Sequence, residues 1–454
     1  MQTSPNPDNS QHATRELGRY ISTSRFVDLP ATVVNEAVRA VVNLMGCAIG
    51  GAHHESVDMA LNGLSPFAGP PQAALAGRSE RTDCLLAALV TGIASHVLDF
   101  DDTHPDLLVH PSGPVASALF PLAELRRSSG AELLNAFVVG VEVQCRVARA
   151  VMPSHYSAGW HITGTAGIFG AVAACARLLG LDETRCAWAL GIAATQSAGL
   201  REMFGSMCKS LHVGRAAQGG MMAALLAEKG FTSADAALEG ARGFIQVLSS
   251  SPNPAALTSG LNKDWELLRN TYKPFACGLV IHPSLDACIQ LRARHGLQAS
   301  RIERIELLVH PLALELTGKV APRTGLEGKF SVFHAAAVGI IDGAGGEAQF
   351  SDARVTAPAV VALRERVRCR SDPRIGMEQA LVTLWCTDGA RHELRVDNCI
   401  GSLGRPLTDA ELDAKFLALS EPVLGIACES ALAALRGLPA ARNAAEISLL
   451  CALA

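Results

Sequence analysis

Apolar residues recur at helical spacing from about residue 15 to about residue 250 of the chain. Gly or Asp punctuates the ends of the resulting segments, as expected where helices stop and start. The predicted helices are 33–49, 130–151, 164–181, 183–200 and 213–230. Their interiors are rich in Ala and Gly, which allows close helix packing, and the absence of a fixed-period repeat argues against a solenoid.

The pattern changes after about residue 265, where strand-like alternation replaces helical spacing. Residues 301–310 alternate as a half-buried strand does, and segments 380–387 and 391–396 flank Asp388-Gly389, a strong hairpin signal. Helices are predicted between them, at 329–341 and 357–367. Thr408, three residues before Glu411, then predicts a helix N-terminus, and helical spacing continues to the end of the chain.

These changes predict a mainly α protein in which a helical domain is interrupted by an α+β domain of about 130 residues. We place a disordered lead-in at 1–14, the first part of the helical domain at 15–268, the α+β domain at 269–401 and the C-terminal part of the helical domain at 402–454. A chain of 454 residues can bury a core of this size.

Composition narrows the classes of partner and compartment. The net charge of −4 and the scattered basic residues argue against a nucleic acid. No apolar segment offers the roughly 20 uninterrupted residues of a membrane span, and residues 1–11 lack the apolar core of a signal peptide. The 13 cysteines are odd in number and lack C-x-x-C spacing, which favours a reduced, cytoplasmic setting over disulfides, zinc or an iron–sulfur cluster.

The densest group of polar residues lies at 95–104 and 110–113, directly after an apolar segment. It contains Asp99, Asp101, Asp102, Thr103, His104 and His110. An ordinary helix end needs one capping residue and not six functional side chains, so we interpret the group as part of a site. The structural alternative is a solvated loop in which one Asp caps the next helix.

A second polar group, at 154–164, lies between two predicted helices and contains Tyr156 and His161. The N-terminus of the following helix would favour an anion, because its amide groups are free and its dipole is positive there. The structural alternative is that His161 caps the helix and Tyr156 packs with its hydroxyl satisfied.

Two further groups contribute cations. Lys209, His212 and Arg215 are spaced by three and would share a helix face, which is costly to bury unless an anion compensates the charge; the alternative is a solvated basic face. Lys273 precedes a proline at the predicted domain junction, with His282 nearby, and clefts between domains often hold small molecules.

Together these groups predict a pocket with several cationic donors, namely Lys209, Lys273, His110 and His161, and at least the carboxylate of Asp99. Such a pocket suits a polycarboxylate, because removal of a proton α to a carboxylate builds negative charge that nearby cations stabilise. We predict no metal, although Asp101, Asp102 and His104 offer a possible set of ligands for a divalent ion.

The same residues carry a family resemblance. The segments 99–103, 110–113, 159–161, 209–216, 272–275 and 328–331 resemble, in this order, those of the MmgE/PrpD family, over about residues 15 to 430. The family includes 2-methylcitrate dehydratase, cis-aconitate decarboxylase and iminodisuccinate epimerase. The resemblance implies a large helical domain built from both ends of the chain, a smaller inserted α+β lid domain, chemistry without a cofactor on small carboxylates, and a homodimer.

By motif position the resemblance places Asp99, Thr103, His110, His161, Lys209 and Lys273 in the pocket. Our predicted catalytic residues are Lys209, Tyr156, His161, His110 and Asp99. Our predicted substrate-binding residues are Thr103, Lys273, His212, Arg215, His104 and His282. No role is assigned to Cys208 or Cys277.

The resemblance leaves the reaction open. Our leading prediction is a 2-methylcitrate dehydratase-like hydro-lyase acting on a di- or tricarboxylate, and an epimerase that uses Tyr156 and Lys209 on opposite faces of a carbon is close behind. Decarboxylation ranks lower, because the decarboxylases place a histidine where this chain has Gly278, and the segment between Thr103 and His110 is one residue longer. A non-catalytic carboxylate-binding protein is the alternative outside enzymes.

Overall fold

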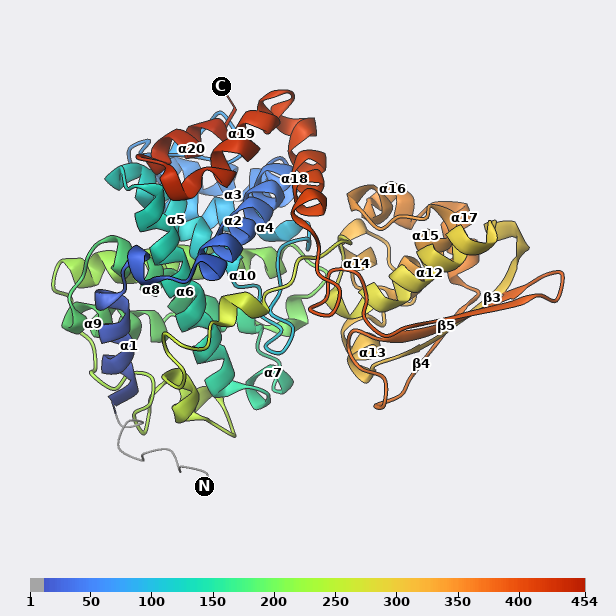
Figure 1. Ribbon diagram of the computed structural model, residues 1–454, viewed down its shortest axis with the longest axis horizontal. Coiled ribbons are helices and arrows are strands. Elements are labelled where there is room, and N and C mark those ends of the chain that lie inside the picture. Colours follow the sequence, from blue (N-terminus) through green and yellow to red (C-terminus); the bar gives the residue numbers. More distant parts are fainter. Residues whose placement is uncertain (1–11, 454) are drawn as a thin grey trace.

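The computed structural model describes residues 12–453 and is mainly α-helical, as predicted. Two parts lie side by side along the longest axis of the molecule (Figure 1). The larger is built of helices apart from a ladder of two short strands, β1 (Ala73–Ala74) and β2 (Arg81–Thr82). The smaller combines a four-stranded sheet with helices, so we call the two the helical part and the α+β part.

The helical part takes its helices from both ends of the chain. The N-terminal segment supplies α1 (Ala13–Thr23), α2 (Ala31–Gly51), α3 (Glu55–Leu64), α4 (Cys84–Val97), α5 (Ser112–Arg126), α6 (Gly130–Val151), α7 (Ser154–Ser157), α8 (Ile162–Leu178), α9 (Glu183–Ala194), α10 (Cys208–Glu228) and α11 (Phe244–Leu248). The C-terminal segment supplies α18 (Asp409–Leu424), α19 (Ala427–Arg436) and α20 (Ala444–Leu450). Helices α18 and α19 pack against α2, and α20 packs against α5, so the red and blue ribbons of Figure 1 lie together.

The α+β part is built on a sheet of strand order β4-β3-β5-β6. Its strands are β3 (Ile302–Val309), β4 (Val367–Ser371), β5 (Ala380–Cys386) and β6 (Arg391–Val396). Strand β3 pairs in parallel with β4 and antiparallel with β5, which forms the predicted hairpin with β6. The helices are α12 (His282–His295), α13 (Pro311–Thr317), α14 (Gly325–Gly328), α15 (Val332–Ile341), α16 (Asp352–Val355) and α17 (Pro358–Arg364), of which α12 and α15 pack together and contact the sheet.

Each part has its own hydrophobic core. Tyr272 belongs to the core of the helical part and Phe275 to that of the α+β part, and the chain changes back between Cys399 and Leu407. Residues 1–11 of the predicted lead-in lie outside the described residues, and its end at 14 was wrong, because α1 already begins at Ala13. The domain boundaries proposed from sequence at 268/269 and 401/402, and the function of the α+β part as a lid, stay predictions.

The crossing of α4 and α10 positions the site, because α4 leads into Asp99 and α10 carries Lys209 near its start. The two helices touch through glycines. A Cβ atom on Gly92 would lie 2.6 Å from Cα of Gly214, and one on Gly214 would lie 2.3 Å from the carbonyl oxygen of Leu89. Any side chain at either glycine would push the helices apart, and would therefore separate Asp99 from Lys209.

Several predicted helix bounds were wrong at one end. Helix α9 stops at Ala194 and not at 200, with Thr195 at its C-terminal end. Helix α15 starts at Val332, because Ser331 caps it by accepting from the amide of His334. Helix α17 stops at Arg364, because Val367 already pairs with β3. Helix α10 begins at Cys208, five residues before the predicted start, which puts Lys209 on the helix itself.

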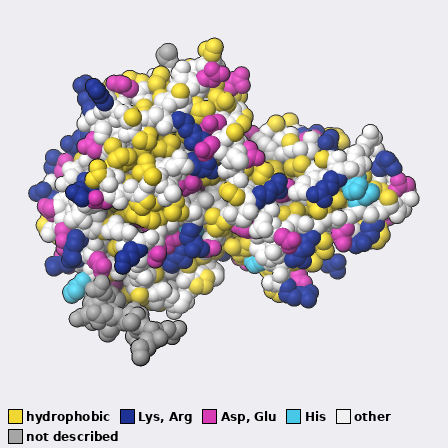
Figure 2. All heavy atoms as spheres, in the orientation of Figure 1, with side chains coloured by type: hydrophobic (Ala, Val, Ile, Leu, Met, Phe, Trp, Pro, Cys, Tyr) yellow, Lys and Arg dark blue, Asp and Glu magenta, His cyan; other side chains and the backbone are white. Residues whose placement is uncertain are grey.

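One described helix, α2, is long and apolar enough to cross a membrane by length and composition, and 78% of its apolar window is buried inside the protein. Burial of that kind is expected for the core helix of a large helical part. On the face shown in Figure 2, basic and acidic side chains are interspersed over both parts, and neither sign of charge dominates.

Candidate active site

A cleft between the two parts encloses about 500 Å³ of space, including its open mouth. The side chains that line it come from segments more than 200 positions apart in sequence. They are Asp99, Thr103, Leu108, His110, Tyr156, His161, Phe204, Lys209, Lys273, Gly278, Leu279, Val280, Leu316, Thr317 and Phe330.

Asp99 is the centre of the charged side of the cleft. Its Oδ1 accepts from Nζ of Lys209 at 2.6 Å and from Nζ of Lys273 at 3.0 Å, and Lys273 also donates to the backbone oxygen of Asp99 at 3.0 Å. Asp99 has φ of 50°, a left-handed conformation that costs a non-glycine residue energy. The second carboxylate oxygen, Oδ2, is buried and has no partner among the described residues.

Lys209 and Lys273 share the Asp99 carboxylate, so these three groups carry one excess positive charge, which the nearby Asp101 offsets. Burial opposes ionisation of Asp99, but Lys209 and Lys273 together outweigh it and lower the Asp99 pKa. Burial lowers the pKa of Lys209, and the charge of Asp99 opposes that shift. The rings of Phe204 and Phe330 lie 5.5 and 5.4 Å from Nζ of Lys209 and enclose it. The arrangement suits a bound anion.

Two histidines share one buried aspartate beside Asp99. Oδ2 of Asp101 lies 2.7 Å from Nδ1 of His96 and 3.3 Å from Nδ1 of His110. Burial raises the Asp101 pKa, but His110 and His96 more than reverse this and hold it well below its ordinary value. Burial lowers the pKa of His96 to about 3 and also lowers that of His110. Both histidines are therefore neutral near pH 7. His96 donates Nδ1–H to Asp101; Nδ1 of His110 lies near both Asp101 and the Thr103 hydroxyl, at 3.4 Å from the latter, and the Asp101 charge favours the tautomer of His110 with its proton on Nδ1.

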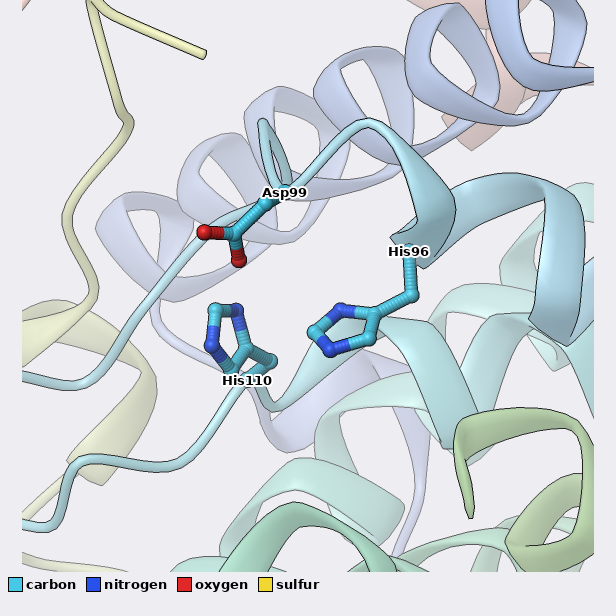
Figure 3. A group of neighbouring side chains, drawn as sticks. All are labelled: His96, Asp99 and His110. Atoms are coloured by element: carbon cyan, nitrogen blue, oxygen red, sulfur yellow. The ribbon is translucent and has the colours of Figure 1, made fainter. Parts of the chain in front are cut away.

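This tautomer leaves Nε2 of His110 unprotonated, so His110 can accept a proton from a ligand in the cleft. Figure 3 shows the rings of His96 and His110 and the carboxylate of Asp99 converging from the end of α4 and the loop before α5. The ring centroids of the two histidines are 4.6 Å apart in an edge-to-face arrangement.

Tyr156 and His161 line the cleft from the segment between α6 and α8. Burial raises the pKa of Tyr156 to about 12, so its hydroxyl stays protonated and can act as an acid; the Arg201 guanidinium lies 4.2 Å from the ring centroid. His161 contacts His212, Nδ1 to Nδ1, at 2.9 Å. Burial, with the charge of Lys209, holds the His161 pKa well below its ordinary value.

His96, Asp99 and His110 offer ligand atoms within 4.8 Å of one another, a spacing that a metal ion could use. The charges argue against a divalent ion there, because Asp99 already accepts from two ammonium groups that would repel it. The three metal ligands considered from sequence each have other partners. Asp101 lies against His96 and His110, and Asp102 accepts from Ser112 and Asn270. His104 contacts Glu266 at 3.0 Å. Metal independence stays a prediction.

Seven of the residues singled out from sequence line the cleft together. They are Asp99, Thr103, His110, Tyr156, His161, Lys209 and Lys273. Thr103 also pairs its backbone with that of Thr271, which joins the loop after α4 to the segment that carries Lys273.

The structure places the other four, assigned from sequence to substrate binding, outside the cleft. His104 is turned away toward Glu266, and His212 lies behind His161. Arg215 is exposed and donates to Gln218. His282 is buried, with Nε2 3.2 Å from the carbonyl oxygen of Cys277 and its ring against Phe275. Lys209, His212 and Arg215 therefore lie in different surroundings on α10. Each step of three residues rotates the side-chain direction by about 300° around the helix axis, so the three do not share one face.

Sequence reasoning also missed residues that shape the site. His96 lies within the first polar group but was given no role, and Phe204 and the apolar residues at 279–280 carry no local signal. Lys415, on α18, is buried and donates from Nζ to Asn43 Oδ1 at 2.7 Å, to the backbone oxygen of Phe100 at 2.6 Å and to that of Lys273 at 2.9 Å. Its partners are distant in sequence, so no spacing could reveal it.

Comparisons with known proteins agree with this arrangement. Residues 15–257 match the model of the MmgE/PrpD N-terminal domain, and residues 275–436 match that of the MmgE/PrpD C-terminal domain. The chain belongs to the MmgE/PrpD family. It is 29% identical over 414 residues to the human cis-aconitate decarboxylase, covering 86% of this chain and 84% of that protein.

Two other relatives of this MmgE/PrpD chain carry the same name. The cis-aconitate decarboxylase of Mus musculus is 30% identical over 364 residues, covering 74% of this chain and 72% of the relative. That of Aspergillus terreus is 25% identical over 351 residues, covering 72% of each chain. The family resemblance read from the motifs is thus confirmed.

Proposed function

We propose that this protein is a lyase that needs no cofactor and acts on a small di- or tricarboxylate by moving a proton at the carbon next to a carboxylate. The observation that carries the proposal is the single carboxylate of Asp99 shared by Lys209 and Lys273, directly beside a neutral His110 held by Asp101. Lyase chemistry is also supported by the names of the relatives described above.

In this proposal the substrate carboxylate binds at Lys209 and Lys273. As the adjacent C–H bond breaks, negative charge grows on that carboxylate, and the two ammonium groups stabilise it because they are already in place. His110 Nε2 accepts the proton. Both lysines contact the Asp99 carboxylate, so we assign them charge stabilisation and assign proton transfer to His110. The alternative keeps Lys209, predicted from sequence as a catalytic residue, as the base.

We propose dehydration as the overall reaction: the proton goes to His110 and the hydroxyl leaves from the neighbouring carbon with a proton from Tyr156 or His161. Both residues line the same cleft, and Tyr156 is protonated at neutral pH, as a general acid must be.

Decarboxylation is the second candidate, favoured by the relatives. It would require proton delivery to carbon after loss of CO₂. Where the decarboxylases are expected to have a histidine, the cleft is lined by Gly278.

Incubation of the purified protein with methylcitrate, cis-aconitate and iminodisuccinate in D₂O, followed by NMR, tests both reactions. A new alkene with loss of the hydroxyl supports dehydration, release of CO₂ supports decarboxylation, and deuterium in recovered substrate reports proton transfer at carbon. Absence of exchange and of product with every small di- or tricarboxylate would leave a non-catalytic binding protein as the better explanation.

Substitution of Lys209 separates charge stabilisation from base catalysis. Lys209→Met should cost roughly 100-fold or more in rate on either assignment. Lys209→Arg keeps the charge but cannot act as a base near neutral pH. Substantial residual activity in Lys209→Arg agrees with charge stabilisation, whereas loss equal to that of Lys209→Met would return the base assignment to Lys209.

Assembly and compartment remain proposals as well. We propose a cytoplasmic homodimer, which sedimentation of the purified protein and localisation of the full chain would test.

A further inference from the structure

The cleft has two chemically different sides. The titratable side chains that line it, from Asp99 to Lys273, all come before the change of hydrophobic core at 272–275 or lie at that change. The opposite side is contributed by the α+β part. We call this side the apolar wall; it consists of Gly278, Leu279, Val280, Leu316 and Thr317, whereas Phe330 of the same part lies against Lys209.

The apolar wall contains no charged side chain among the described residues that line the cleft. Its single hydroxyl, on Thr317, donates to the backbone oxygen of Ala313 within α13 and so is already occupied. Lys329 lies next to Phe330 in sequence but is turned away: its Nζ donates to Leu98 O at 2.7 Å, to Ala276 O at 3.1 Å and to Glu347. The wall thus offers no cation to a ligand.

The charge of the other side limits how many carboxylates the cleft can hold. With Asp101 ionised and both of its histidines neutral, the two positive charges of Lys209 and Lys273 are already offset by Asp99 and Asp101. A carboxylate bound near the lysines is balanced if His161 takes up a proton, since a nearby anion favours the charged imidazole, and each further carboxylate needs another cation. A third carboxylate would have to lie against the apolar wall, where burying an unpaired charge is costly.

We propose that the cleft selects small acids with their carboxylates gathered at one end, at Lys209 and Lys273, and an uncharged arm at the other, against the apolar wall. This inference rests on the proposed function and narrows it from di- or tricarboxylates to those whose arm is uncharged. In this arrangement the helical part binds the reacting end of the substrate, and the α+β part determines which arm the cleft accepts.

A matched pair of ligands tests the proposal without turnover. 2-Ethylsuccinate and propane-1,2,3-tricarboxylate share one carbon skeleton and differ only in whether the arm ends in a methyl or a carboxylate group. Calorimetric titration of the wild-type protein at low ionic strength should show 2-ethylsuccinate binding at least about tenfold more tightly, because only the methyl group gains from the apolar wall.

Leu279 is the position for a change of preference, because it lines the cleft and is only half-buried. Leu279→Arg places a cation on the apolar wall and should reverse the order, so that the tricarboxylate binds more tightly. Leu279→Met is the matched control, since it keeps the wall apolar at similar volume, and it should preserve the wild-type order.

The outcomes separate the inference from the function beneath it. If the wild-type protein binds the tricarboxylate as tightly as 2-ethylsuccinate or more so, the selectivity is wrong while carboxylate binding stands. If Leu279→Arg leaves the order unchanged, the arm does not contact the apolar wall and the inference fails. If wild-type protein binds neither acid, and neither acid protects it against heating, the proposed function fails with it.

Discussion

Removal of the Asp99 charge is the most direct test of how the site is held together. In Asp99→Asn the side chain keeps its shape, but Lys209 and Lys273 lose the one carboxylate that both contact. Two ammonium groups that touch the same oxygen are within about 6 Å of each other, so at an effective dielectric constant of about 20 their repulsion is roughly 3 kcal/mol. Breaking a buried ion pair by removing one partner typically costs about 3–5 kcal/mol.

The protein can relieve this repulsion if Lys209 releases its proton. A repulsion of this size lowers the Lys209 pKa further, in addition to the decrease that burial already causes. A lysine whose folded-state pKa is lowered binds fewer protons when folded than when unfolded, so stability increases as pH rises between the two pKa values. The deficit of Asp99→Asn relative to wild type should therefore be largest near pH 6 and smaller near pH 9.

Urea unfolding followed by tryptophan fluorescence, at several pH values, measures this deficit. Asp106→Asn is the matched control: Asp106 is exposed and pairs with the exposed Arg269, so its loss should cost less than about 1 kcal/mol at any pH. A dianion such as malonate should restore stability to Asp99→Asn more than to wild type. A deficit of Asp99→Asn below about 1 kcal/mol, unchanged between pH 6 and 9, would refute the shared ion pair as the organiser of the site.

Three further predictions follow from buried contacts. Lys415→Met removes three hydrogen bonds but no side chain that lines the cleft. We expect slower turnover and a shifted pH profile, with little change in the fold as measured by circular dichroism. Wild-type kinetics would contradict a positioning role for Lys415. Burial lowers the His96 pKa to about 3, compared with about 6.5 in the unfolded chain, so the folded protein should lose stability as pH decreases below about 6.5. In His96→Gln, the free energy of unfolding should depend less steeply on pH between about 6.5 and about 4. Chelator should leave activity intact, because the cations at Asp99 repel a divalent ion; activity lost with chelator and restored by a divalent ion would count against this.

Sequence periodicity was sufficient where local signals agree with the tertiary structure. Helix α6 has the bounds predicted for it, and a capping box of Ser129 and Glu132 begins it. The predicted hairpin forms with Gly389 at φ of 86°, and Thr408 and Glu411 form the predicted capping box. These features depend on residues a few positions apart, so the sequence displays them directly.

The site could be predicted only in part, because its charges are balanced over long separations. Lys209 was grouped with His212 and Arg215 by spacing, whereas the group that contacts it is Asp99, 110 positions away in sequence. His104 was predicted to bind substrate, but its partner is Glu266, 162 positions away, and sequence spacing gives no sign of that contact. Polar side chains grouped after a helix indicate a site, but which of them face the ligand depends on partners that only the fold brings near.

Lys415 shows why the chain returns to the helical part after the α+β part is complete. Its Nζ donates to the carbonyl of Phe100, the residue after Asp99, and to the carbonyl of Lys273 itself. Burial lowers the Lys415 pKa to about 8. The centroid of the Phe100 ring lies 3.9 Å from Nζ of Lys415 and offers a cation–π contact. One side chain of the C-terminal segment thus joins the two loops that carry Asp99 and Lys273, one after α4 and one at the change between the two cores. The C-terminal segment thus contributes to the placement of Asp99 and Lys273, the two charges on which the proposed chemistry depends. It has a role in the site as well as in the packing of the helical part.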